Sequence, residues 1–305
     1  PSASRYGKGS HIRNLLQGIR DDEKVISILP MERSLIENPE GHFLMFATAN
    51  GRIKKSKLSE YSRINRNGKF ALKFAEGDSD NLVSVRPATN ADHVVLVSAS
   101  GNACRFMPAE KKTRISPDNG ESVTTYVVRV QGRISQGVSG MKLSQDDRVI
   151  GMIVTDDFDT SVLTISKYGM AKRSRLGSGE MIPLTEDGSP VFDESGDQIF
   201  ERDGYRKTNR GTKGVRTMSL RDGDEIVGVR QIPDLDDQLF MLTGSGMMIR
   251  MVSGQTKETL GKVTKGTRIM ELRNRDRTGY EDEIVFVARL PSELISAGES
   301  LEEEE

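Results

Sequence analysis

The sequence predicts an all-β protein, a propeller-like β-pinwheel of repeated four-stranded antiparallel blades, about five units with the first one partial. Two repeats support this. Four times, an apolar run reaches a Ser/Thr-x-x-Gly turn and a further strand follows; the turn glycines are Gly51, Gly101, Gly169 and Gly246. A second glycine motif recurs between these hairpins. Apolar runs broken by glycine turns are typical of antiparallel hairpins, and hairpin pairs repeated at 50 to 77 residues are typical of propeller blades.

The second motif is a glycine with an apolar residue six positions later. Its five copies begin at Gly9, Gly68, Gly137, Gly214 and Gly266. An acid-rich turn and an apolar run follow each copy, and we expect strands at residues 25–29, 82–85, 149–154, 226–229 and 284–287. The repeats therefore divide one β domain, residues 1–291, into blades near 5–30, 42–87, 93–154, 161–233 and 238–291.

Two insertions interrupt the repeats. Residues 107–131 and 176–205 separate strand signals that remain intact on both sides, so we expect surface loops there. Short helical turns are expected only near 57–61 and 291–297, and residues 292–305 form an acidic tail. Because there are five copies of the second motif and four first hairpins, we expect the chain to begin in the middle of a unit and to be part of something longer.

Several functional classes lack support in the residues. The single cysteine, Cys104, rules out a disulfide framework and a zinc site of several thiolates, and we expect it to be a small core residue. His11, His42 and His93 do not have metal-ligand spacing, and the acidic pairs lie at turn positions. The glycines do not form a nucleotide-binding fingerprint. We therefore expect no metal, no cofactor and no catalytic group, in a soluble chain of the cytoplasm.

The formal net charge of −1 hides an uneven distribution. Residues 176–205 carry a net charge of −7 and residues 299–305 a net charge of −5, which leaves +11 on the other 268 residues. A basic body with two acidic appendages suits a polyanionic partner better than its total charge suggests.

The basic residues recur at equivalent places. The fourth residue after each turn glycine is Lys55, Arg105, Arg173 or Arg250. Four residues before the second glycine lie Arg5, Arg133, Arg210 and Lys262, with Arg63 displaced by one. Further candidates for DNA contact are Lys8, Arg52, Lys54, Lys57, Arg66, Lys69, Lys172, Arg175, Arg206, Lys207, Lys213 and Lys265. If every blade offers cations at one level, a basic belt surrounds the rim.

Double-stranded DNA is the natural ligand for such a belt. Contact with phosphates needs Lys, Arg and backbone amides rather than groups that distinguish bases. Aromatic residues make up 5% of the chain and there is no tryptophan, so little is available to stack on unpaired bases. Lysines that only prevent edge-to-edge aggregation of strands would explain some of these residues, but not their recurrence after the same turn.

Three segments resemble the C-terminal domain of the A protein of DNA gyrase: residues 46–55 (FATANGRIKK), 213–228 (KGVRTMSLRDGDEIVG) and 14–30, which contains DEKVISILP. The resemblance covers about residues 5–291 apart from the insertions. It implies a β-pinwheel whose neighbouring blades exchange a strand, and which bends and wraps duplex DNA to support negative supercoiling. It also implies two partners, the remainder of the gyrase A protein and the gyrase B protein. The chain would then be a non-catalytic, nucleoid-associated part of an ATP-dependent type II topoisomerase.

The sequence departs from that family in two places. Family domains carry a Gln-Arg-Arg-Gly-Gly-x-Gly box, whereas residues 3–9 (ASRYGKG) lack the Gln, one Arg and one Gly, so we expect the box to lie upstream. The acidic insertion is also atypical, and we expect it either to contact another protein of the holoenzyme or to compete with DNA for the rim. A topoisomerase IV domain with weaker wrapping is the alternative parent.

Two functions of other classes stay open. One is a protein-interaction propeller whose insertions form the binding surface, and the other is an enzyme built on a propeller. Charge reversal at Lys54, Lys55, Arg173 and Arg250 is expected to abolish DNA binding and to leave a protein scaffold folded.

Overall fold

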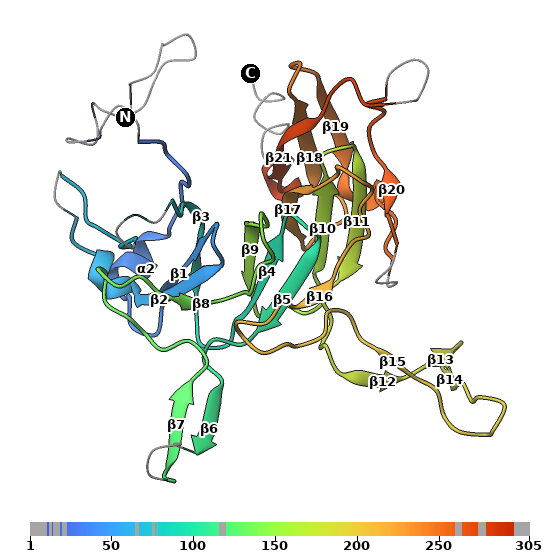
Figure 1. Ribbon diagram of the computed structural model, residues 1–305, viewed down its shortest axis with the longest axis horizontal. Helices are drawn as coiled ribbons and strands as arrows, with labels where there is room; N and C mark the ends of the chain where they lie inside the picture. The colour runs from blue at the N-terminus through green and yellow to red at the C-terminus, as the bar shows by residue number, and fades with distance from the viewer. Residues whose placement is uncertain are drawn as a thin grey trace.

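The computed structural model describes residues 11, 14, 19, 23–64, 67–74, 77, 79–115, 120–259, 264–273 and 279–295. Within them, four antiparallel sheets stand side by side in an arc, and two long hairpins project from it (Figure 1). The predicted all-β fold of repeated blades is confirmed.

The first sheet shows the plan of a blade. Its central strand β1 (Phe43–Thr48) pairs with β2 (Arg52–Lys57) across the turn at Gly51 and with β3 (Leu82–Ala88) on the other side. The fourth strand is β8 (Val138–Ser139), which pairs with β2 and comes from the following unit. This sheet therefore combines three strands of one unit with a short strand of the next.

The other sheets follow the same order. The second contains β9 (Val149–Thr155), β4 (His93–Ser98), β5 (Asn102–Phe106) and β16 (Val215–Arg216). The third contains β17 (Ile226–Ile232), β10 (Ser161–Ser166), β11 (Met170–Arg175) and β20 (Thr267–Arg268). The fourth contains β21 (Ile284–Leu290), β18 (Gln238–Thr243) and β19 (Met248–Val252).

Strand exchange corrects the simpler expectation that both hairpins of a unit form one sheet. The first hairpin and the last strand of a unit stay together, whereas the second glycine motif crosses to the preceding sheet. The resemblance had implied such an exchange. Because each short strand has its partner in another unit, neighbouring blades are tied by backbone hydrogen bonds.

The expected strand at residues 25–29 is absent, since residues 23–32 have no strand structure. In the other units the last strand pairs with the first hairpin of its own unit, whereas the sequence before residue 25 contains no apolar run that leads into a Ser/Thr-x-x-Gly turn. Leu29 and Met31 instead pack with Leu35 against the outer face of the first sheet.

Helices are few and short. Among the described residues they are α2 (Arg33–Glu37), η1 (Leu58–Tyr61) and η2 (Ser253–Gln255), with helical residues also at 14 and 292–295. The turn expected near 57–61 is thus present, whereas α2 was not anticipated. No helix of the described residues is long and apolar enough to cross a membrane.

Both insertions form hairpins rather than irregular loops. β6 (Lys111–Ile115) pairs with β7 (Ser122–Tyr126), and β12 (Met181–Pro183) pairs with β15 (Phe200–Arg202). The second hairpin ends in the pair β13 (Thr185–Glu186) and β14 (Ser189–Pro190). Figure 1 shows both hairpins extending away from the sheets.

The cores lie between neighbouring sheets. Met45 and Leu96 share one cluster, Val97 and Val162 a second, and Leu163 and Leu239 a third, so three interfaces between blades are filled with apolar side chains. The central strands β1, β4 and β10 are buried along their whole length. Burial on both faces explains their continuous apolar sequences.

The acid-rich turns before the last strand of each unit supply carboxylates that stabilise the neighbouring glycine turns. A carboxylate oxygen accepts a hydrogen bond from a backbone N–H of the neighbouring glycine turn in every sheet: Asp80 from Asn50, Asp147 from Ser100, Asp224 from Tyr168 and Asp282 from Ser245. These contacts fix the last strand of each unit to its first hairpin. No cluster of metal-ligating side chains exists among the described residues.

The second glycine is required at the three strand exchanges, where a Cβ on Gly137, Gly214 or Gly266 would meet a carbonyl oxygen of the preceding sheet. At Gly214 the backbone φ is +74°, and an added Cβ would lie 2.1 Å from the carbonyl oxygen of Ala103. We expect Gly214→Ala to lower the free energy of unfolding by about 3 kcal/mol, because a left-handed backbone and a collision with a neighbouring strand both oppose it. Urea unfolding measures the change.

Gly188 is the matched control for this prediction. Its φ is +79°, but nothing lies within 4 Å of an added Cβ. Gly188→Ala should therefore cost only the backbone term, about 1 kcal/mol. Equal losses in the two variants would show that the close approach at Gly214 contributes nothing.

Candidate nucleic-acid interface

Buried cations hold the exchanged segments in place. We call residues 129–139, residues 206–216, and residues 257–259 with 264–268 the crossing segments, because each pairs with the outer strand of the preceding sheet. Single parallel bridges join Lys55 to Val130, Arg105 to Lys207 and Arg173 to Glu258. The basic residue four positions after the turn glycine therefore contacts the beginning of a crossing segment in three sheets.

Arg105 shows this role most fully. Its side chain is fully buried, and Nη1 donates to the carbonyl oxygens of Leu176 at 2.8 Å and Tyr205 at 2.9 Å. Nε donates to Nδ1 of His93 at 3.2 Å. The pKa of His93 is lowered to about 4 by burial and by the positive charge of Arg105, which keeps the imidazole neutral and able to accept this bond. Arg105 thus joins its own strand to both ends of the acidic insertion.

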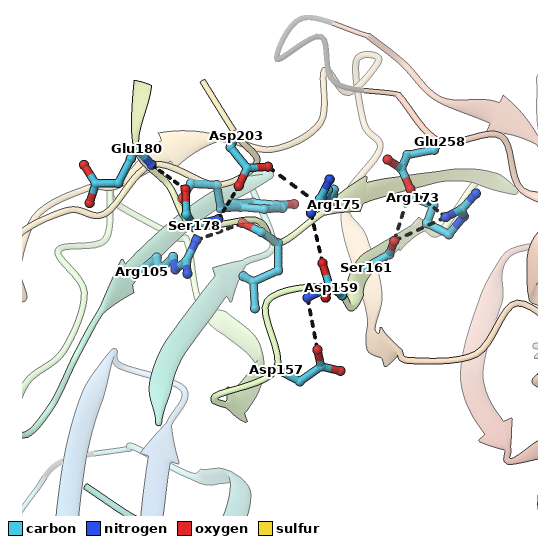
Figure 2. A network of polar contacts seen from close by, with 12 residues as sticks. Arg105, Asp157, Asp159, Ser161, Arg173, Arg175, Ser178, Glu180, Asp203 and Glu258 are labelled. Carbon is cyan, nitrogen blue, oxygen red and sulfur yellow. Dashed lines mark hydrogen bonds and ion pairs between the residues drawn. The ribbon is translucent and has the colours of Figure 1, made fainter. Parts of the chain in front are cut away.

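Arg173 and Lys55 make the corresponding contacts in their sheets. Arg173 donates through Nε to the carbonyl of Thr256 at 3.0 Å and through Nη1 to Glu258 at 2.7 Å. The Lys55 ammonium donates to Asn90 at 2.7 Å and lies 4.0 Å from the centroid of the Phe43 ring. Figure 2 shows Arg105 and Arg173 in the polar network.

The residue three positions after the turn glycine also points inward. Lys54 donates to the carbonyls of Ala71 at 2.7 Å and Arg133 at 2.6 Å, and Lys172 donates to that of Thr217 at 2.7 Å. Burial lowers the pKa of each ammonium to about 8. Cys104 takes this position in the second sheet, where its thiol is buried in the core as expected.

Five of the predicted DNA-binding residues are therefore not on the surface. Lys54, Lys55, Arg105, Lys172 and Arg173 are each at most 8% exposed. The expectation that the fourth residue after each turn glycine forms an exposed belt is corrected in three sheets of four, and only Arg250 is exposed there. At these three positions the side chains point inward and donate to Asn90, to the ends of the acidic insertion and to Glu258 of the third crossing segment.

The remaining described candidates retain access to solvent. The exposed ones are Lys57, Arg63, Arg175, Arg206, Lys207, Lys213, Arg250 and Lys265, and the half-buried ones are Arg52, Lys69, Arg133 and Arg210. Arg210 donates to the carbonyls of Val127 and Ser139, so it also supports the junction. Arg5, Lys8, Arg66 and Lys262 lie outside the described residues.

The exposed cations concentrate on the crossing segments. The second segment carries Arg206, Lys207, Lys213 and Arg216, the first carries Arg129, and the third carries Lys257, Lys265 and Arg268. Arg129, Lys257, Arg216 and Arg268 are not among the predicted residues. Arg216 and Arg268 follow the second glycine by two positions, a repeat that the sequence offered as a signal.

A pocket of about 370 Å³ opens beside the second crossing segment. Its cationic lining consists of Lys172, Arg175, Arg202, Arg206 and Arg216, against a single carboxylate, Glu201. Arg206 and Arg216 are exposed and make no side-chain hydrogen bond or ion pair within the described part of the chain. Their guanidinium groups are available to a phosphate.

The acidic insertion begins and ends at these cations. Glu180 pairs with Lys207 at 2.8 Å. Asp203 lies 3.6 Å from Arg175, which also pairs with Asp159 at 2.9 Å (Figure 2). Hydrogen bonding from Ser178 is the main reason that the pKa of Asp203 is lowered, so this carboxylate is charged at neutral pH. Carboxylates of the insertion therefore form ion pairs with two of the predicted DNA-binding residues, Arg175 and Lys207.

The chain resembles known proteins in sequence. The profile of a family described as the DNA gyrase C-terminal domain, a beta-propeller, matches residues 1–30, 42–89, 122–156, 199–233 and 237–278. The DNA gyrase A protein of Mycolicibacterium smegmatis is 30% identical over 290 residues, which cover 93% of this chain and 28% of that protein. The DNA gyrase A protein of Rickettsia prowazekii is 30% identical over 298 residues, covering 89% and 30%. The chain thus spans less than a third of these relatives.

Solved structures agree on the fold. The C-terminal domain of DNA topoisomerase IV superposes with a TM-score of 0.68 at 18% identity, covering 96% of this chain and 75% of that one. The C-terminal domain of DNA gyrase A gives 0.60 at 19% identity, with coverages of 93% and 76%. At such identities the likeness concerns the fold alone.

Proposed function

The chain belongs to the DNA gyrase C-terminal domain family, and from this premise we propose that it binds duplex DNA independently of sequence, along the exposed cations of the crossing segments. One observation carries the proposal. Each of the three crossing segments forms a backbone bridge to a buried basic residue of the preceding sheet and presents exposed cations, so equivalent positive groups recur from blade to blade. Repeated cations on a rigid scaffold suit a ligand with regularly spaced phosphates.

Wrapping follows from the same arrangement. The sheets form an arc (Figure 1), and a duplex that contacts successive crossing segments must bend to follow them. The energy of bending would be offset by contacts to phosphates on several blades. We propose that this wrapping supports negative supercoiling, in association with the remainder of the gyrase A protein, the gyrase B protein and the nucleoid.

Two comparisons of affinity test DNA binding. Two unrelated 40-base-pair duplexes should bind with dissociation constants that agree within about twofold, because phosphate contacts carry no sequence information. A single strand of equal length should bind more weakly, since the crossing segments offer few aromatic side chains for stacking. Absence of duplex binding, or preference for one sequence, would contradict the proposal.

A protein-interaction function has one observation in its favour. The β12–β15 hairpin exposes apolar side chains among its carboxylates: Met181 is 49%, Phe192 is 56% and Phe200 is 51% exposed. Such residues on a projecting hairpin suit a protein partner. This second candidate predicts that deleting the hairpin abolishes partner binding and leaves DNA binding intact.

The acidic insertion is expected to weaken DNA binding at low salt. Replacing Glu186, Asp187 and Glu194 by Gln, Asn and Gln should tighten affinity about threefold, because exposed carboxylates on the insertion repel the phosphates of DNA. All three are exposed, and none makes a side-chain hydrogen bond or ion pair to another described residue. Fluorescence anisotropy at 50 mM salt measures the change.

Glu32→Gln, Glu37→Gln and Glu40→Gln together form the matched control, since these exposed carboxylates lie in the segment around α2. This triple variant removes the same net charge and should change affinity less. The gain from the insertion variant should shrink above 0.3 M salt, where screening is strong. If the two triple variants change DNA affinity equally, the insertion acts only through the net charge of the chain, and competition with DNA for the rim is contradicted.

A further inference from the structure

The inner strands of the four sheets surround a central cavity. β3 contacts β9, β9 contacts β17 and β17 contacts β21, and residues of all four line a space of about 480 Å³. Three arginines reach this space, Arg86 from β3, Arg230 from β17 and Arg289 from β21. None of them belongs to the crossing segments.

Two of these arginines occupy equivalent positions. Arg86 lies four residues after Leu82, which pairs with Thr48, and Arg230 lies four residues after Ile226, which pairs with Ser166. The equivalent residue, four positions after the one that pairs with the end of the central strand, is Ile153 in the second sheet and Ala288 in the fourth. The fold therefore accepts apolar side chains at this position, and the arginines are not needed to build the blade.

The positive charges of the cluster are incompletely neutralised. Arg289 pairs with Asp237 at 2.8 Å. Arg86 donates to the carbonyl of Val85 at 2.9 Å, and Arg230 donates to the carbonyls of Val229 and Val287, but neither forms an ion pair within the described residues. Burial, and then the charges of Arg86 and Arg289, lower the pKa of Arg230. Partly buried cations that crowd one another are costly without a counter-charge.

A smaller cavity of about 150 Å³ lies directly among the three arginines. Gln231 and the apolar side chains of Met152, Ile153, Val154 and Val229 complete its lining. A space of this size holds about five waters, which is sufficient for a small oxyanion. We propose that this arginine cavity binds a free multivalent oxyanion of the phosphate class, held by guanidinium groups from different blades.

Inorganic pyrophosphate is the probe for this site. Isothermal titration of the full chain should give saturable binding with one site per chain, and the melting temperature should rise with pyrophosphate concentration. In the Arg86→Met, Arg230→Met variant the affinity should fall at least about tenfold, because two of three charge-assisted contacts are lost. Without anion the variant should stay folded, because the relief of two crowded cations offsets the loss of their hydrogen bonds to the carbonyls of Val85, Val229 and Val287.

Arg33→Met with Arg148→Met is the matched control. It removes two exposed arginines that lie outside both the arginine cavity and the crossing segments, and it should leave pyrophosphate binding unchanged. Unchanged pyrophosphate affinity in the Arg86, Arg230 variant, or equal losses in both variants, would overturn the proposal. Pyrophosphate would then be attracted by the surface charge of the chain and not by the cavity.

Duplex DNA separates this site from the rim. The Arg86→Met, Arg230→Met variant should bind a 40-base-pair duplex as tightly as the original chain, because the cavity is too small for a duplex. A parallel loss of DNA and pyrophosphate affinity would assign these arginines to DNA contact and contradict a separate anion site. Pyrophosphate binding that survives in a chain unable to bind DNA would leave this inference standing while the proposed function fails.

Discussion

Replacing Arg105 by methionine is expected to lower the free energy of unfolding by about 4 kcal/mol, among the largest effects of any single substitution. The guanidinium is fully buried and donates to two carbonyls and to His93. Methionine fills similar space but leaves these acceptors without their donor, and each orphaned buried group costs about 1–3 kcal/mol. Urea unfolding of the variant measures the loss.

Arg250 provides the control within the same chain. It also follows its turn glycine by four residues, but its side chain is exposed. It lies near the Phe240 ring and donates to Gln238, contacts that are worth little at the surface. Arg250→Met should therefore cost less than about 1 kcal/mol. Similar losses at both positions would mean that burial of Arg105 does not determine its role.

The difference between buried and exposed cations changes how charge-reversal variants must be interpreted. A glutamate at Lys54, Lys55 or Arg173 would bury a carboxylate against carbonyl oxygens, and we expect the chain to unfold. Lost DNA binding in such a variant would report lost structure. The two functions must be separated with exposed residues instead.

Neutralising one exposed cation on each crossing segment is expected to weaken DNA binding about 30-fold at 0.1 M salt. The variant carries Arg129→Gln, Lys213→Gln and Lys265→Gln, three exposed side chains without a hydrogen bond or ion pair among the described residues. If each contacts one phosphate, the slope of log affinity against log salt should become less steep by about 0.9 for each. The free energy of unfolding should change by less than about 1 kcal/mol.

The control removes three exposed cations elsewhere. Lys24→Gln, Arg33→Gln and Arg148→Gln change the net charge equally, but these residues lie outside the crossing segments. Their loss should weaken binding by only a few fold through the general field. If both triples have the same effect, DNA does not follow the crossing segments.

The sequence predicted the fold because hairpin signals are local. A glycine turn between apolar runs specifies two paired strands wherever the rest of the unit lies, and the positive φ at Gly51, Gly101, Gly169 and Gly246 agrees with this. The exchange of β8, β16 and β20 is a long-range pairing, with no local signal beyond the glycine that permits the close approach. It followed from the family resemblance and not from the residues alone.

The site was harder to predict, because periodicity does not distinguish an inward from an outward cation. Lys55 and Arg105 recur with the regularity expected of a functional belt, yet both side chains are buried and donate to acceptors inside the protein. Arg216 and Arg268 recur in only two of the five copies of the second motif, and they lie in the exchanged strands, where alternation alone could not assign a face. Burial in an interface between blades decides the role, and it depends on the exchange.

The salt dependence of duplex binding tests the central claim most directly. The full chain is titrated with a random 40-base-pair duplex between 50 and 300 mM salt. Cations on several crossing segments predict that log affinity falls linearly with log salt, with a slope of about −4 or steeper that is equal for unrelated sequences. Binding that is absent, or insensitive to salt, would contradict the claim that the crossing segments form a DNA-binding rim.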